Sequence, residues 1–119
     1  PKGLPANCPP TCAKANLSWT NLTGQNFRQA DLQGANLSFA NLAGADLSQA
    51  KLQNANLYST ALRGATLSGA NLNGADLSWA NLAQANLSGA DLTGAKLDSA
   101  VLGDANLTGA TMPDGTRHK

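Results

Sequence analysis

The sequence predicts an all-β fold in which the chain winds into a quadrilateral β-helix, a repeat solenoid of about five coils with four pentapeptides each. Three observations predict it. A large apolar residue stands at every fifth position from Leu17 to Met112, and it is Leu in eighteen of the twenty cases. Ala stands two residues before this central residue in seventeen of the twenty cases. Aromatic residues recur at multiples of twenty, as Trp19, Phe39 and Trp79.

The five-residue period fits neither the 3.6-residue period of a helix nor the two-residue period of a strand. In an extended segment, residues i and i−2 point to the same side, so each Ala-x-Leu triplet places both apolar side chains inward. The next two residues must then turn a corner, and Gly frequently occupies the second of them, as in Gly44 and Gly89. Glycine adopts a positive φ at little steric cost. The twenty-residue recurrence of aromatics indicates four such corners in each coil.

Three segments follow one another along the chain. We expect residues 1–14 to form an N-terminal cap, residues 15–112 the β-helix and residues 113–119 a C-terminal tail. The uncovered end of a β-helix exposes unpaired backbone, which invites association. The tail is short, so either it folds loosely over the last coil or this end is a contact surface. We therefore expect a monomer or an end-to-end dimer.

The two cysteines of the chain, Cys8 and Cys12, lie in the expected cap. Pro9 and Pro10 bend the loop between them, and a structural disulfide requires Cα atoms within about 7 Å. We expect a disulfide, with free thiols as the alternative. The spacing excludes a redox Cys-x-x-Cys motif, and zinc would need more ligands than this pair and the distant His118 supply. A disulfide would indicate an oxidising compartment.

Composition argues against several functions. Eight Lys and Arg oppose seven Asp, giving a net charge of +1, and the cations are scattered singly. A nucleic-acid partner is therefore not expected. No apolar run is long enough to span a membrane. No nucleophile stands beside a base and no phosphate-binding loop is present, so we expect no enzyme, no cofactor and no metal. The chain opens on Pro1, from which we expect a processed or truncated product.

The candidate binding face consists of Trp19, Phe39 and Trp79, in one column, with Tyr58 one residue out of it. Exposed aromatic side chains on a surface of small residues are typical anchors of interfaces. The alternative is that the rings stack on one another or pack against the cap.

The array Ala-[Asn/Asp]-Leu-x-x resembles the pentapeptide-repeat family over residues 15–112. The resemblance implies a right-handed β-helix with the central Leu and the preceding Ala buried. The family has no shared catalytic residues. The lead "ANCPPTCAKANL" is similar to that of a cyanobacterial and chloroplast branch in the thylakoid lumen, although the spacing here is Cys-x3-Cys.

The resemblance and the residues together predict a non-catalytic rigid scaffold or protein-interaction module with an unknown protein partner. Another branch of the family imitates DNA to protect a topoisomerase, a role that the near-neutral charge disfavours. An ice-binding or carbohydrate-binding β-helix is a further alternative. We expect the protein in the thylakoid lumen or periplasm, with the cytoplasm as the alternative.

Overall fold

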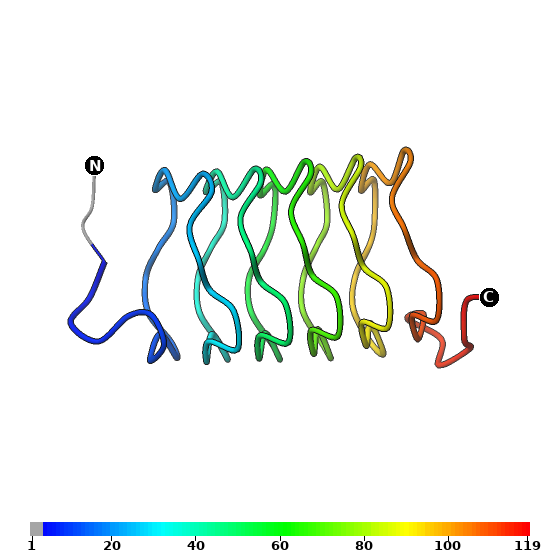
Figure 1. The fold of residues 1–119 in the computed structure, drawn as a ribbon, viewed down its shortest axis with the longest axis horizontal. Helices are drawn as coiled ribbons and strands as arrows, with labels where there is room; N and C mark the ends of the chain where they lie inside the picture. The colour runs from blue at the N-terminus through cyan, green and yellow to red at the C-terminus, as the bar shows by residue number, and fades with distance from the viewer. Residues whose placement is uncertain (1–3) are drawn as a thin grey trace.

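The computed structural model describes residues 4–119 as a straight rod with nearly equal short axes, 39 × 21 × 20 Å (Figure 1). The described residues contain neither helices nor continuous strands. Their ordered contacts are isolated β-bridges that run along the rod. No helix in this part of the chain has the length and apolar character that crossing a membrane requires.

The register of these bridges is constant. All of them except Thr111 with Arg117, which is antiparallel, join two residues twenty positions apart in parallel orientation, as in Asp31 with Lys51 and Asp76 with Lys96. The first parallel bridge is Thr11 with Asp31 and the last is Asp91 with Thr111. One turn of the chain is therefore four pentapeptides, as the spacing of the aromatic residues predicted. The total of about five coils stays a prediction, because no continuous strand delimits a coil.

A single repeat, residues 86–90, shows how the sequence pattern satisfies the backbone. Asn86 N–H donates to Ala65 O at 2.9 Å, in the preceding turn, and Leu87 N–H donates to Asn106 O at 2.7 Å, in the following one. Gly89 N–H also reaches the following turn, at Thr108 O, and Ala90 N–H closes the corner on Leu87 O. The fifth donor, Ser88 N–H, bonds to the side-chain Oδ1 of Asn86 at 3.0 Å. All five amides of the repeat are thereby paired.

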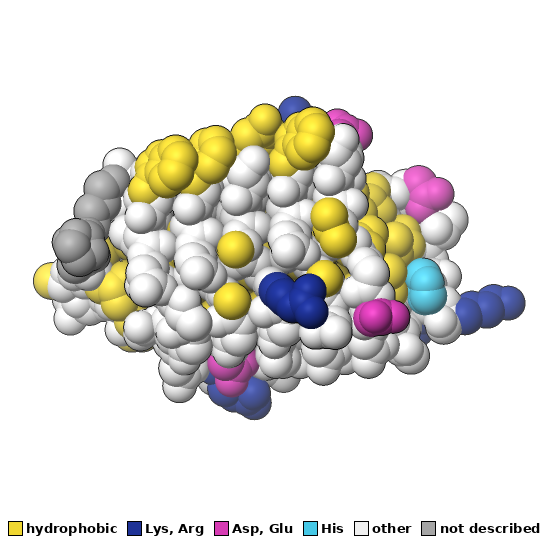
Figure 2. Space-filling model, turned by 90° about the horizontal axis from the view of Figure 1, so that it is seen from above, with side chains coloured by type: hydrophobic (Ala, Val, Ile, Leu, Met, Phe, Trp, Pro, Cys, Tyr) yellow, Lys and Arg dark blue, Asp and Glu magenta, His cyan; other side chains and the backbone are white. Residues whose placement is uncertain are grey.

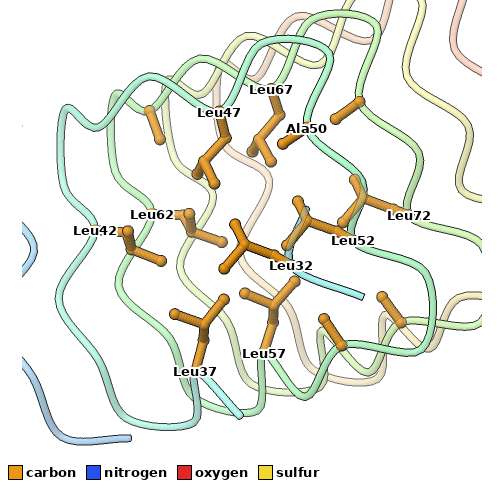
Figure 3. Close-up of a cluster of buried hydrophobic side chains, with 14 of the residues drawn as sticks. Leu32, Leu37, Leu42, Leu47, Ala50, Leu52, Leu57, Leu62, Leu67 and Leu72 are labelled. Carbon is orange, nitrogen blue, oxygen red and sulfur yellow. The ribbon is translucent and has the colours of Figure 1, made fainter. Parts of the chain in front are cut away.

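The core is a narrow column of leucines along the axis of the rod (Figure 3). Every central Leu from Leu32 to Leu92 is at most 1% exposed, and the alanines packed beside them are equally buried. Burial of apolar surface stabilises a fold by about 25 cal/mol per Å², so this column is the main stabilising feature of the rod. Thr60 replaces an inward Ala and remains buried because its hydroxyl donates to Leu37 O at 2.8 Å.

The two ends of the rod differ. Near the N-terminus, Leu17 and Phe27 are fully buried, although few turns precede them. Residues 11–15 form a further pentapeptide on the ladder, with buried Cys12 in the central position and Ala15 N–H closing the corner on Cys12 O. The segment expected to be only a cap thus contributes a repeat to the first turn. At the other end, Leu97, Leu102 and Leu107 are only partly buried.

Candidate functional site: an aromatic ridge

The candidate binding residues lie along one corner of the rod. Figure 2 shows a row of apolar side chains along one edge of a mostly polar surface. We call Trp19, Phe39, Tyr58 and Trp79 the aromatic ridge. Trp19 is 73% exposed and Trp79 is 60% exposed, so these side chains contribute little to the core.

Three members of the ridge occupy the strained position of the corner turn. Trp19, Phe39 and Trp79 have φ between 61° and 63°, the left-handed region that the turn requires of its second corner residue. Gly fills this position in nine other repeats, including Gly44 and Gly89. A bulky residue with such a backbone loses about 1–2 kcal/mol relative to a relaxed one. At Trp79, which is 60% exposed, the chain tolerates this local cost without recovering it in an aromatic contact among the described residues.

The rings of the ridge are not equivalent. Trp19 stacks on Phe39 with ring centroids 4.4 Å apart and planes at 5°. Tyr58 contacts the edge of Phe39 at 5.7 Å, and its backbone N–H donates to Asn56 Oδ1. Trp79 stacks on no other aromatic ring among the described residues. The stacking alternative thus describes Trp19, Phe39 and Tyr58, and it leaves Trp79 unexplained.

The carboxylates of the rod take part in turns. Asp46 and Asp91 occupy the position before the central residue and accept hydrogen bonds from Ser48 Oγ at 2.6 Å and Thr93 Oγ1 at 2.7 Å. These hydroxyl donors, together with the backbone N–H of the same residues, hold the pKa of both carboxyl groups below the usual value. An ionised, hydrogen-bonded carboxylate is a poor general acid. In the described part of the chain, no three His, Cys or Asp side chains are grouped as metal ligands, and no pocket is present.

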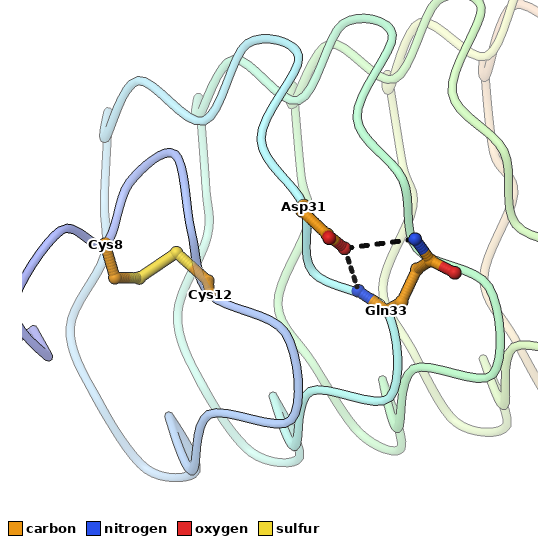
Figure 4. Close-up of a disulfide and its surroundings, with 4 residues drawn as sticks. All are labelled: Cys8, Cys12, Asp31 and Gln33. Carbon is orange, nitrogen blue, oxygen red and sulfur yellow. Dashed lines mark hydrogen bonds between the residues drawn. A yellow bond between two sulfur atoms is a disulfide. The ribbon is translucent and has the colours of Figure 1, made fainter.

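The cysteine pair lies inside the first turn of the rod. The structure joins Cys8 and Cys12 in a disulfide with Cα atoms 4.9 Å apart, and both residues are buried (Figure 4). Asp31, on the following turn, accepts bonds from the backbone N–H and the Nε2 of Gln33, also drawn in Figure 4. The pair is a structural element of the N-terminal end.

Sequence reasoning missed two features of these sites. Cys12 is a central residue, which its position five before Leu17 could have indicated. The Asn or Asp that precedes most central residues accepts a hydrogen bond from the backbone N–H two residues further on, a partner that the sequence analysis did not identify. The signal was the preference for Asn and Asp over other polar residues, which is typical of side chains that cap backbone amides.

Comparison with known proteins identifies the class of protein. The family model for pentapeptide repeats in eight copies matches residues 12–49, 40–78 and 75–112. The chain therefore belongs to the pentapeptide-repeat family, whose solved members form right-handed quadrilateral β-helices. No match is found among the curated proteins.

Solved structures agree with this assignment. HetL, a pentapeptide repeat protein involved in heterocyst differentiation regulation from the cyanobacterium Nostoc sp. strain PCC 7120, is 37% identical with a TM-score of 0.60. The match covers 91% of this chain and 60% of HetL, so the chain spans less than two thirds of that protein. A pentapeptide repeat protein from the Arabidopsis thaliana thylakoid lumen is 35% identical, with a TM-score of 0.53 over 87% of this chain and 69% of that one. Rfr23 from the cyanobacterium Cyanothece 51142 is 35% identical, with a TM-score of 0.52 over 94% and 93% of the two chains.

Proposed function

We propose that this protein is a non-catalytic interaction module, a rigid rod that presents the aromatic ridge to a protein partner. The observation that carries the proposal is Trp79, which is 60% exposed in a backbone conformation that nine other repeats give to Gly. Strained, exposed residues point to a function other than stability. Tryptophan is also enriched among the residues that contribute most to binding at protein interfaces.

The shape of the surface favours a protein over a small molecule. Small-molecule sites are concave and enclose most of the ligand. The described residues contain no pocket, and the aromatic ridge projects from a corner of the rod. A projecting row of rings can enter an apolar groove on a partner. Stacking on a carbohydrate is the second candidate, since Trp79 offers an unstacked ring.

Two further functions receive less support. A mimic of DNA requires a strongly negative surface, whereas eight Lys and Arg oppose seven Asp here. An ice-binding face requires ranks of aligned Thr, and the Thr residues are scattered through the repeats.

The proposed location is an oxidising compartment, the thylakoid lumen or the periplasm. The Cys8–Cys12 disulfide supports it, because such bonds persist where thiols are not kept reduced. The 35% identical protein from the Arabidopsis thylakoid lumen supports the first of these two compartments.

The experiment captures partners from a lumenal or periplasmic extract with three baits. The first is the unaltered protein, and the second carries Trp19→Gly, Phe39→Gly and Trp79→Gly. The third, a matched control, replaces three polar residues at the same turn position on other corners with Gly, at Gln29, Gln49 and Gln84. We expect a protein that the first and third baits retain and the second loses.

Purified partner is then titrated against the first and third baits, which keep both tryptophans, Trp19 and Trp79, and their fluorescence is the readout. A shift of tryptophan emission on binding supports the aromatic ridge as the contact. Equal retention by all three baits would remove the ridge from the interface. Retention of glycans alone would favour the carbohydrate alternative.

A further inference from the structure

The side of the rod that adjoins the aromatic ridge carries one exposed cation, Arg63. The chain turns a corner after each ridge position, so this adjoining side consists of residues 20–24, 40–44, 60–64, 80–84 and 100–104. Arg63 is the only Lys or Arg in these five pentapeptides. Figure 2 shows that the surface beside the row of apolar side chains is mostly uncharged. The guanidinium of Arg63 forms no hydrogen bond or ion pair with any described residue, so it is available to a ligand.

The backbone of Arg63 is available as well. On the preceding coil, Ala43 N–H donates to Asn41 Oδ1 at 3.0 Å, and the following coil repeats this arrangement. Ala61 replaces the Asn between them and offers no side-chain acceptor, although its parallel bridges keep the register. Arg63 N–H consequently has no acceptor within residues 4–119. The hydrogen-bonding pattern of this side is therefore broken at the residue that carries the cation.

The combination of a free amide with a cationic side chain occurs once among the described repeats. Other repeats that lack the Asn or Asp also leave the equivalent amide unpaired, at Ala13, Gln53, Ser68, Asp98 and Gly103. None of these side chains is positively charged. A carboxylate can accept hydrogen bonds from the N–H and the guanidinium of Arg63 together. A polyanion such as a nucleic acid requires a run of cations, so one carboxylate is the better fit.

Arg63 also lies near the aromatic ridge. It follows Ser59 by four residues, which span at most about 14 Å. Ser59 occupies the ridge position on the coil between those of Phe39 and Trp79, and it has no ring. Trp79 therefore stands beside this coil without an aromatic partner among the described residues.

We propose that Arg63 and Trp79 form one composite site for a protein segment that carries an acidic residue close to an aromatic one. The carboxylate binds the guanidinium and the backbone N–H of Arg63, and the aromatic ring packs against the indole of Trp79. Aromatic pairs of this kind are stabilising beyond the area that they bury. The inference rests on the proposed function of the aromatic ridge and adds the chemistry of its partner.

Three short peptides test the composite site by proton–nitrogen correlation NMR. The first is acetyl-Glu-Ser-Trp-amide, in which the Glu and Trp side chains lie on one side of an extended backbone. The others are acetyl-Gln-Ser-Trp-amide and acetyl-Glu-Ser-Ser-amide. We expect the first peptide to shift the signals of Arg63 N–H and Trp79 Nε1–H and to bind about tenfold more tightly than either of the others. Added salt should reduce this advantage over the Gln peptide, because it screens exposed charges.

Two substitutions of the cations show whether the charge of Arg63 is specific. Arg63→Gln should bind the first peptide about tenfold more weakly. Arg28→Gln is the matched control, because Arg28 is an exposed cation at the same position of another repeat, with its N–H bonded to Asn26 Oδ1. It should bind the peptide like the unaltered protein. Circular dichroism melts verify that both variants fold.

A second pair of variants separates binding from stability. Ala61→Asn supplies an internal acceptor to Arg63 N–H, so it should weaken binding of the first peptide about threefold although it stabilises the fold. Val101→Asn makes the same change on the same side of the rod, where it pairs the N–H of Gly103, and should leave the affinity unchanged.

Unchanged binding of the first peptide by Arg63→Gln, or equal affinities of the Glu and Gln peptides, would overturn the inference. If Trp79→Gly still loses the captured partner in that case, the proposed function stands without the carboxylate contact. Glucuronic acid is the last ligand tested. A shift of Arg63 N–H with this sugar, and with no peptide, would assign the carboxylate to a glycan and would also overturn the inference.

Discussion

At the residue scale, the position before each central residue decides whether a repeat is fully hydrogen-bonded. Four of the five amides in a repeat find backbone acceptors, and the fifth depends on Oδ1 of Asn or Asp, as in Asn86 with Ser88 N–H at 3.0 Å. In one repeat this position is occupied by Ala61 instead. The backbone N–H of Arg63, two residues further along the chain, then has no acceptor within the described residues. The preference for Asn and Asp is thus a property of the turn.

Asn86→Ala tests this role. The variant leaves a half-buried amide without its partner, so we expect the free energy of unfolding to fall by about 1 kcal/mol. The reciprocal change, Ala61→Asn, supplies an acceptor to Arg63 N–H and should raise the free energy of unfolding. The gain should be only a few tenths of a kcal/mol, because this corner is more exposed. Urea unfolding of both variants measures the difference. Equal stability of Asn86→Ala and the unaltered protein would contradict the assignment.

Replacement of Trp79, in contrast, should raise the free energy of unfolding. Gly relaxes the left-handed backbone at φ 63°, and the exposed ring has no aromatic partner to lose among the described residues. We expect Trp79→Gly to be about 1 kcal/mol more stable in urea unfolding.

Gln84→Gly, at the same position of the next corner with φ 61°, is the control and should show a similar gain. If Trp79→Gly is instead destabilised while Gln84→Gly is not, the indole packs structurally and the case for a binding role weakens.

At the scale of the element, the first turn depends on a bond that the later turns do not need. Cys12 is a small central residue, and the disulfide to Cys8 fills the end of the core that a leucine fills elsewhere. The backbone also holds this segment, since Cys12 N–H donates to Asp31 O at 2.8 Å and Asp31 N–H to Pro10 O at 2.7 Å.

Cys8→Ser separates these two contributions. Closure of so short a loop limits the entropic gain from the disulfide to about 2 kcal/mol. We expect urea unfolding to show that the free energy of unfolding of Cys8→Ser is lower by up to that amount. The unaltered protein in reductant should show the same decrease. No loss in either sample would show that the backbone ladder alone secures the N-terminal end.

At the scale of the whole molecule, the features that repeat could be predicted, and so could the Cys8–Cys12 disulfide, whereas other features that occur once could not. The buried column and the twenty-residue register follow from the positions of Leu, Ala and the aromatic residues, because nearly every repeat places the same residue types at the same positions. The pairing of residues 109–112 with the tail has no repeated pattern to indicate it. Nor does spacing reveal that Tyr58 turns toward Phe39 and leaves Trp79 apart, since that depends on side-chain rotation at one corner.

The carboxylates in the repeats give the whole rod a pH dependence. Hydroxyl and amide donors of Ser48, and of Thr93, lower the pKa of Asp46 and Asp91 in the folded state, and Asp76 is lowered chiefly by Ser78. A lowered pKa means that the ionised carboxylates stabilise the fold above the ordinary value of 3.8 and that this contribution is lost as the pH falls below it. We therefore expect the urea midpoint to decrease as the pH is lowered from 5 to 2.

The variant with Asp46→Asn and Asp91→Asn is the control. It keeps both Oδ1 acceptors but does not titrate at these positions, so its urea midpoint should decrease less over the same pH range. An equal decrease in both proteins would assign the acid sensitivity to other groups.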